Sequence, residues 1–406
     1  MKPSGVEPSG TEQLSRRDIF RRGGAALAGL AALEARAFAA PLPSQTDPIR
    51  HLVDRLGYGP RPEELARAHE LGAEAFLEEQ LRPETLADAE LDERLARLPL
   101  LGMDRRTLYR LPDYQGRCYR TLVEGAVLRA VHSRRQLFER MVEFWSDHFN
   151  VPADFDITPD LILMQREVIR KHALGSFREL LLGVARSPAM LYYLDNDESV
   201  KEHPNENWAR ELLELHTLGV DGPYDEQDVK AVARAFTGWT THERAEDGFY
   251  FDPESHDADA KTILGHAFPA GRGIEDGLHV LGLLADHPAT ARFVCAKLCR
   301  RFVSDAPDPA LVEALAGVWL ETGGKIRPIL RALFTSEAFA ASAGQKLRRP
   351  FDFFAGALRA TGTEVLEFWL LEEMLGELGQ VPYGWQPPNG YPDSAGAWLS
   401  TSGLLT

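Results

Sequence analysis

Helical hydrophobic periodicity recurs along almost the whole chain and limits the folds that it can adopt. Apolar residues return every three or four positions, which is the pattern of helices that bury one face. No GxGxxG sequence, P-loop, nucleophile elbow or HExxH sequence is present, so the standard signatures of these enzyme classes are missing. The segments with helical periodicity are residues 63–81, 87–98, 117–150, 159–174, 176–187, 205–218, 225–237, 288–303, 309–322, 326–335, 350–361 and 369–378.

The stretch from residue 238 to residue 273 departs from this pattern. It is rich in aromatic, acidic and turn-forming residues, and residues 248–252 predict a short strand that pairs with residues 239–242. Long irregular insertions in helical domains are often functional. The sequence therefore predicts a mainly α protein, a single multi-helix domain over residues 40–406 with one irregular or short β insertion around residues 238–273. An apolar run that begins at Leu404 also predicts a truncated C-terminus.

The first 39 residues predict a twin-arginine signal peptide. Arg16 and Arg17 precede an uncharged apolar stretch at residues 23–33, and small residues at Ala37 and Ala39 define a cleavage site. The stretch is too short to span a bilayer, which takes about 20 residues. A Sec signal and an ordinary amphipathic helix are the alternatives. The prediction places the mature protein in the periplasm or outside the cell, with the twin-arginine export machinery as a partner. Because that machinery carries folded proteins, it also favours a cofactor loaded before export.

The mature chain is acidic. Of 45 Lys and Arg residues and 61 Asp and Glu residues, six and four lie in the first 39, which leaves a net charge near −18. Nucleic acid is thus a disfavoured partner, because phosphate binding requires basic surface. No further apolar run approaches the length of a transmembrane segment.

The three cysteines are Cys118, Cys295 and Cys299, an odd number that argues against a disulfide scaffold. Cys295 and Cys299 are four residues apart and share a helix face. They can hold a soft metal or, as the sequence favours, pack as apolar residues.

Three histidines and an aspartate are candidate metal ligands. His148 and His216 lie on the apolar faces of their helices, and His256 and Asp257 lie in the irregular insertion. Neutral imidazole binds transition metals, and a carboxylate can ligate the metal or orient a histidine. We hypothesise that these four residues converge on a transition metal. The alternative is that the histidines are hydrogen-bonded core residues and that Asp257 pairs with Lys261.

The polar face of residues 205–218 supplies candidate catalytic residues. Glu206, Arg210 and Glu214 follow one another at a spacing of four, and Glu211 lies on the same side. A solvated ion-pair ladder, at about 0.3–0.5 kcal/mol per pair, is the simpler interpretation. The alternative is a buried polar network in which Glu206, Arg210 and Glu211 are catalytic.

Arg300 and Arg301 stand together near the end of the 288–303 helix. Two adjacent cations can bind an anion. A solvated basic patch beside the negative end of the helix dipole is the expected arrangement.

Several segments have a distinctive spacing of aromatic and charged residues. They are RLGYGP at 55–60, FWSDHFNV at 144–151, NENWARELLELHTLGV at 205–220, ARAFTGW at 233–239, HPATARFVCAKLCRRFV at 287–303 and PPNGYPDSAGAW at 387–398, with His256-Asp257, Lys261 and Gly265 between them. From about residue 50 onward, the chain resembles the bacterial family called domain of unknown function 1800. The resemblance implies a mostly helical exported protein and, as a partner, an exported sulfatase-like protein that is often encoded beside it. It implies no reaction.

Two functions are consistent with these features. The first is an exported enzyme that uses a metal or another cofactor, which the buried histidines and the export signal favour. The second is a non-catalytic cell-envelope protein that binds or assembles with an exported partner, which the acidic surface and the missing catalytic motifs favour.

Overall fold

A computed structural model describes residues 47–153, 156–242, 247–363 and 367–399. Residues Asp47–Thr406 form one compact unit, and helices make up most of it. The predicted mainly α fold is therefore confirmed. The predicted signal peptide and the apolar end of the chain from residue 400 lie outside the described residues. Within the described ranges, no helix is both long and apolar enough to span a membrane.

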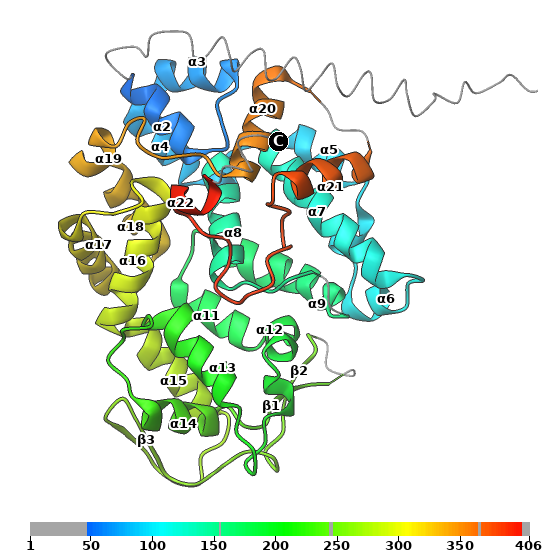
Figure 1. The fold of residues 1–406 in the computed structure, drawn as a ribbon, viewed down its shortest axis with the longest axis vertical. Coiled ribbons are helices and arrows are strands. Elements are labelled where there is room, and N and C mark those ends of the chain that lie inside the picture. The colour runs from blue at the N-terminus through cyan, green and yellow to red at the C-terminus, as the bar shows by residue number, and fades with distance from the viewer. Residues whose placement is uncertain (1–46, 154–155, 243–246, 364–366, 400–406) are drawn as a thin grey trace, which may run out of the picture. The chain divides into compact units, whose positions relative to one another are not determined.

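The first helices surround α8, which lies at the centre of Figure 1. The predicted 117–150 helix is divided, because Ser133 Oγ and the Arg134 N–H both donate to the carboxylate of Asp88, at 2.6 and 3.1 Å, and turn the chain. The helices are α2 (Pro48–Leu56), α3 (Pro62–Leu71), α4 (Ala73–Gln80), α5 (Ala89–Leu95), α6 (Arg105–Tyr109), α7 (Tyr114–His132) and α8 (Gln136–His148), with 3-10 turns at Pro83–Thr85 and Pro99–Gly102.

Two of the predicted helices contain π-helical segments. In the second of them, the Leu218 N–H donates to the carbonyl of Leu213 at 2.7 Å, five residues back. Each such segment adds a residue to the helical turn and shifts the faces of the residues that follow. The elements are α9 (Thr158–Leu163), the π segment Met164–Ile169, α10 (Arg170–His172), α11 (Phe177–Ala185), α12 (Pro188–Tyr193), a 3-10 turn at Asn196–Glu198, α13 (Glu206–Glu211), the π segment Leu212–Thr217 and α14 (Glu226–Ala235).

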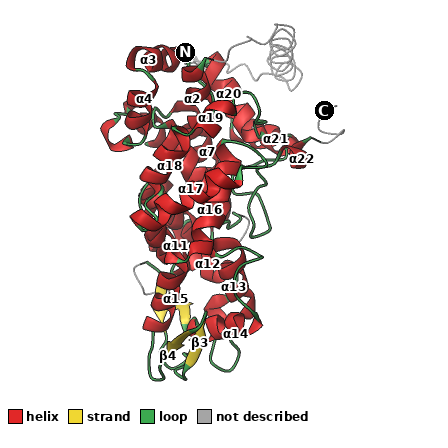
Figure 2. Ribbon diagram, turned by 90° about the vertical axis from the view of Figure 1, so that its left-hand side faces the viewer, coloured by secondary structure: helices red, strands yellow, loops and turns green. Residues whose placement is uncertain are grey.

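The insertion forms two antiparallel hairpins at one end of the unit, as Figure 2 shows for the second. Strand β1 (Trp239–Thr241) pairs with β2 (Phe249–Phe251), which confirms the predicted pairing. Strand β3 (Lys261–Ile263) pairs with β4 (His266–Phe268), a hairpin that was not predicted.

Helices α16, α17 and α18 lie on one side of α8, whereas α20 and α21 pack with α7 in the smaller core (Figure 1). Successive helices α16, α17 and α18 pack against one another (Figure 1). The remaining helices are α15 (Glu275–Asp286), α16 (Pro288–Phe302), α17 (Pro309–Thr322), α18 (Ile326–Phe334), α19 (Glu337–Ala341), α20 (Pro350–Thr361), α21 (Phe368–Glu377) and α22 (Ala395–Trp398).

Two apolar cores hold these helices together. The larger core contains Trp145, Phe177 and Trp319, and the smaller one joins α7 to α20 and α21 through residues such as Tyr58 and Phe351. Helix α8 borders both cores, which places its polar face at the junction between them.

The C-terminal loop, residues 380–393, returns across the end of α8. Asn150 Nδ2 donates to the carbonyls of Trp385 and Pro387 at 2.7 and 2.8 Å. Gly390 has φ +71°, and a Cβ added there would lie 1.9 Å from the carbonyl oxygen of Asp147. Only glycine allows the loop to approach α8 this closely.

Replacement of Gly390 by alanine is therefore expected to displace the loop. We expect Gly390→Ala to lower the free energy of unfolding by about 2–3 kcal/mol, because the Cβ meets backbone and the φ is unfavourable. Urea denaturation measures this effect. Gly396→Ala is the matched control, because a Cβ at Gly396 meets no atom of the described residues within 4 Å. Equal stability of the two variants would contradict the close packing of the loop.

Candidate functional site

The structure brings His148 and His216 close together in the aromatic core. Their ring centroids are 6.2 Å apart, and both side chains are buried. His148 Nε2 lies 3.1 Å from the carbonyl oxygen of His216, so this nitrogen carries the proton. Nδ1 then accepts from Lys297 Nζ at 3.0 Å. Both ring nitrogens of His148 are thus engaged by the protein.

Burial keeps both imidazoles neutral. It lowers the pKa of His148 well below its usual value, and nearby Lys297 lowers it further. The same two causes lower the pKa of His216 to about 3. His216 Nε2 has no hydrogen-bond partner within the described part of the chain.

His256 and Asp257 have other partners. His256 Nδ1 donates to the carbonyl of Thr237 at 2.8 Å. Asp257 accepts two hydrogen bonds from Arg234, at 2.6 and 3.1 Å. Lys261 contacts Asp257 through its backbone carbonyl, at 2.5 Å, and not through its carboxylate. Its ion pair is with Asp276 of α15, at 2.8 Å.

The four candidate ligands therefore do not form one cluster. Among the residues that the structure describes, no group of three or more His, Cys, Asp or Glu side chains could hold a metal ion. The three cysteines are buried thiols, and burial raises the pKa of Cys118 to about 11 and of Cys299 to about 12.

The residues of the α13 polar face form surface contacts. Arg210 pairs with Glu226 of α14 at 2.9 Å and with Glu214 at 3.5 Å. Glu206 is exposed, and Glu211 is half-buried with a pKa raised by burial and by Glu214. The Arg210–Glu214 part of the predicted ladder is thus present, and the Arg210–Glu226 pair links α13 to α14.

A network of buried charges lies where α8, α16, the start of α20 and the C-terminal loop meet. Arg349 binds both Glu143 and Asp147, the latter at 2.7 Å. Arg301 binds Glu143 at 2.8 Å and Asp393 at 2.6 Å. Arg301 and Arg349 are 1% and 2% exposed, so the solvated patch expected at Arg301 is wrong. We call these five residues the charge network.

Tyr58, Arg140 and Asp352 extend the charge network. Tyr58 donates its hydroxyl to Glu143 at 3.0 Å, and Arg140 bonds to Glu143 at 3.2 Å and to Asp352. The positive neighbours lower the pKa of Asp393 to about 2 against the effect of burial. They likewise hold the pKa of Asp352 below its usual value.

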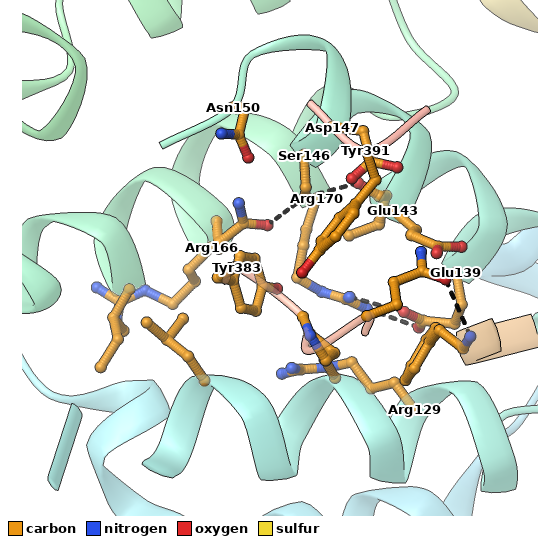
Figure 3. A pocket seen from close by; sticks show the side chains of 18 of the residues that line it. Arg129, Glu139, Glu143, Ser146, Asp147, Asn150, Arg166, Arg170, Tyr383 and Tyr391 are labelled. Atoms are coloured by element: carbon orange, nitrogen blue, oxygen red, sulfur yellow. Dashed lines mark hydrogen bonds and ion pairs between the residues drawn. The ribbon is translucent and has the colours of Figure 1, made fainter. Parts of the chain in front are cut away.

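A cavity of about 190 Å³ opens beside the charge network, between the two cores. We call it the Asp147 cavity. Apolar residues of both cores form part of its wall, and the polar part comes from α7, α8, the first π segment and the C-terminal loop (Figure 3). Its polar lining includes Tyr58, Arg129, Glu139, Glu143, Ser146, Asp147, Asn150, Gln165, Arg166, Arg170, Gln380, Tyr383 and Tyr391.

The first π segment supplies polar groups to this cavity. Ser146 Oγ donates to Gln165 Oε1 at 2.9 Å, and Arg166 Nη1 donates to the carbonyls of Leu101 and Met103. π-Helical turns often occur at functional sites, because the extra residue redirects side chains.

Asp147 and Arg129 are the unusual charges of the cavity. Burial raises the pKa of Asp147 to about 6, and Glu143 and Asp393 add to the increase against the lowering effect of Arg349 and Arg301. Arg129 forms no ion pair in the described ranges, and its Nε is buried without a hydrogen-bond partner.

The neighbouring arginines of the cavity are neutralised. Arg170 binds both oxygens of Glu139 at 2.7 and 2.8 Å, and Arg166 binds Glu167 at 2.5 Å. In Figure 3, Arg129 rises from α7 on the opposite side of the cavity from Asp147. The cavity thus combines one unpaired cation with one carboxyl group whose pKa is close to neutral.

Residues 51–406 match the family model described as Protein of unknown function (DUF1800). The chain belongs to this family. A search of curated proteins and a search of solved structures gave no match to the chain.

In this DUF1800 protein, the resemblance motifs contribute directly to the site. Tyr58 comes from RLGYGP, Asp147 and His148 from FWSDHFNV, Arg301 from the 287–303 segment and Asp393 from PPNGYPDSAGAW. Sequence reasoning missed the site because it followed the histidines. One signal was available, since Arg301 continues the apolar stripe of Val294 and Leu298 on α16.

Loss of Arg349 is expected to leave two buried carboxylates without their partner. We expect Arg349→Met to reduce the free energy of unfolding at pH 7 by about 3–5 kcal/mol. The control is Arg327→Met, because Arg327 makes an exposed pair with Glu84 at 2.9 Å, which we expect to contribute less than 1 kcal/mol. Guanidinium chloride denaturation compares the two. A similar small loss in both variants would show that the charge network is not essential.

The raised pKa of Asp147 makes a specific contribution to the pH dependence of stability. An acid whose pKa rises from about 4 in the unfolded chain to about 6 in the folded one stabilises the fold below pH 4, and this stabilisation is lost as the pH rises through 6. We therefore expect Asp147→Asn to gain about 3 kcal/mol relative to the wild type between pH 4 and pH 6. Denaturation curves at several pH values measure the difference. A difference that does not change with pH would refute the raised pKa.

Proposed function

We propose that this protein is an exported enzyme that performs general acid–base chemistry on a small polar molecule bound in the Asp147 cavity. The observation that carries the proposal is the pairing, in one cavity, of a carboxyl group with a near-neutral pKa and an unpaired arginine. Functional sites concentrate such perturbed groups in concave, partly apolar pockets.

Arg129 is the proposed anchor for the substrate. A half-buried guanidinium without a carboxylate partner is costly, and a carboxylate or phosphate of the substrate would relieve that cost. Gly125, one turn earlier on α7, makes room for it, because a Cβ at Gly125 would lie 3.0 Å from Arg129 Nη1. The proposed substrate therefore carries a negative group.

Asp147 is the proposed catalytic residue. A carboxyl group with a pKa of about 6 is present in both protonation states near neutral pH, as a general acid or base requires. Arg349 holds its Oδ2 at 2.7 Å and acts as a positioning residue. Glu143 lies beside it and is bound by three arginines and by Tyr58.

The proposal keeps the predicted export and replaces the predicted metal chemistry. Export rests on the predicted twin-arginine signal at residues 1–39, and three buried free thiols suit a chain that folds before export. The metal hypothesis has no set of three or more His, Cys, Asp or Glu ligands among the described residues, and the proposed chemistry uses Asp147.

A second candidate is the non-catalytic role with an exported partner. It is favoured by exposed apolar side chains on α20 and α21, where Phe353 is 38% and Trp369 50% exposed. Apolar groups in such positions are suited to contact another protein.

The proposed activity can be tested on the purified mature protein. A panel of small hydroxy acids, sugar acids and amino acids is screened by thermal shift, and compounds that bind are followed by NMR for conversion. We expect Arg129→Gln to weaken binding at least tenfold, because the substrate loses its charged partner. We expect Asp147→Asn to preserve binding and to reduce turnover at least a hundredfold.

Two controls separate the alternatives. Arg117→Gln alters an exposed arginine of the same helix and should change neither property. Trp369→Ser removes the exposed ring on α21 and should also leave turnover unchanged. Turnover that survives Asp147→Asn, or binding that ignores Arg129→Gln, would overturn the proposal. A panel without any bound compound would favour the partner-binding role.

A further inference from the structure

A second pocket borders Asp147 and lies beside the proposed acid–base site. It has a volume of about 200 Å³ and lies between α8, α16 and the C-terminal loop. We call it the Lys297 pocket. It shares only Asp147 and Tyr391 with the Asp147 cavity.

Two cations face this pocket without a carboxylate partner. Lys297 and Arg300 are three residues apart on α16, so they lie on one face of the helix. Neither forms an ion pair with a carboxylate in the parts of the chain that the structure describes. Lys297 Nζ bonds to His148 Nδ1 at 3.0 Å, and Arg300 Nε bonds to the carbonyl of Asp305 at 3.4 Å.

The hydrogen-bond partners of these cations are uncharged groups, although Asp393 and Asp147 lie near Lys297 and raise its pKa against the lowering effect of burial. His148 donates through Nε2 to the His216 carbonyl, so the imidazole that touches Lys297 is neutral. The carboxylates that border the pocket, Asp147 and Asp393, are hydrogen-bonded to Arg349 and Arg301.

The rest of the lining adds ring surfaces and an amide. Trp385 and Tyr391 contribute rings whose centroids are 5.0 Å apart. Asn389 accepts from Trp385 Nε1 at 2.9 Å through its Oδ1, which leaves its amide nitrogen without a partner among the described residues. The pocket therefore offers two cations and an amide donor beside aromatic walls.

We infer that the Lys297 pocket binds a small organic anion, with its carboxylate or phosphate group between Lys297 and Arg300. An oxyanion accepts charge-assisted hydrogen bonds from both cations, and an amide donor can complete its coordination. The aromatic walls provide a surface for the apolar or ring part of the ligand. This site uses the anion-binding potential of Arg300 that the sequence already suggested.

The inference is tested by calorimetric titration of the folded mature chain with benzoate, acetate and inorganic phosphate in a low-salt buffer. We expect benzoate to bind more tightly than acetate, because its ring meets Trp385 and Tyr391. Lys297→Gln and Arg300→Gln should each weaken benzoate binding at least tenfold. Arg292→Gln is the control, since Arg292 lies on the same helix in an exposed pair with Glu313 and should have no effect.

The outcomes separate this site from the proposed acid–base site. Because Arg129 is itself a proposed carboxylate anchor, the titrations are repeated in the Arg129→Gln background, where the benzoate that still binds is expected to occupy the Lys297 pocket. Arg300→Gln keeps the test valid even if Lys297→Gln misfolds, because Arg300 is only half-buried. Benzoate binding that is equal in the wild type and Arg300→Gln would overturn the inference. Binding of inorganic phosphate but of neither carboxylate would overturn its organic part.

Discussion

The pairing of Arg349 with Glu143 and Asp147 is the interaction on which the centre of this structure depends. These residues, with Arg301 and Asp393, bring together α8, α16, the start of α20 and the C-terminal loop. Each of these charges would be costly to bury without its partner. The packing of any one of the four segments therefore depends on the other three. The charge network thus selects one arrangement of helices whose apolar faces alone would tolerate others.

The charge network also explains why two cavities occur beside it. Side chains held in ion pairs do not fill the volume between the two cores as apolar side chains would. Asp147 borders both of the cavities that result. The C-terminal loop closes over them because Gly390 touches the backbone of Asp147. A low-dielectric environment with fixed charges is a suitable setting for the proposed acid–base chemistry, since it separates the pKa values of neighbouring carboxyl groups.

Much of the secondary structure could be predicted from the sequence, because it follows from local patterns. Most of the helices, the β1–β2 pairing and the burial of His148 and His216 follow from periodicity and composition, whereas α2 and α15 lie outside the predicted segments. The π-helical segments could not be predicted, since an i to i+5 bond leaves no local mark in the residue pattern. These segments matter for the site, because the first of them places Gln165 and Arg166 in the lining of the Asp147 cavity.

The sequence by itself thus determined a mainly α protein with neutral histidines in an aromatic core. Only the tertiary structure decided which charges meet. Arg349 lies 206 residues from Glu143, and no helical or strand periodicity relates two residues at such a distance. A charged residue on a core-facing stripe, such as Arg301, signals that a partner exists, but its identity depends on which segments pack together. For this reason the candidate site emerged at Asp147, Arg129 and Lys297 rather than at the histidines that the sequence first suggested.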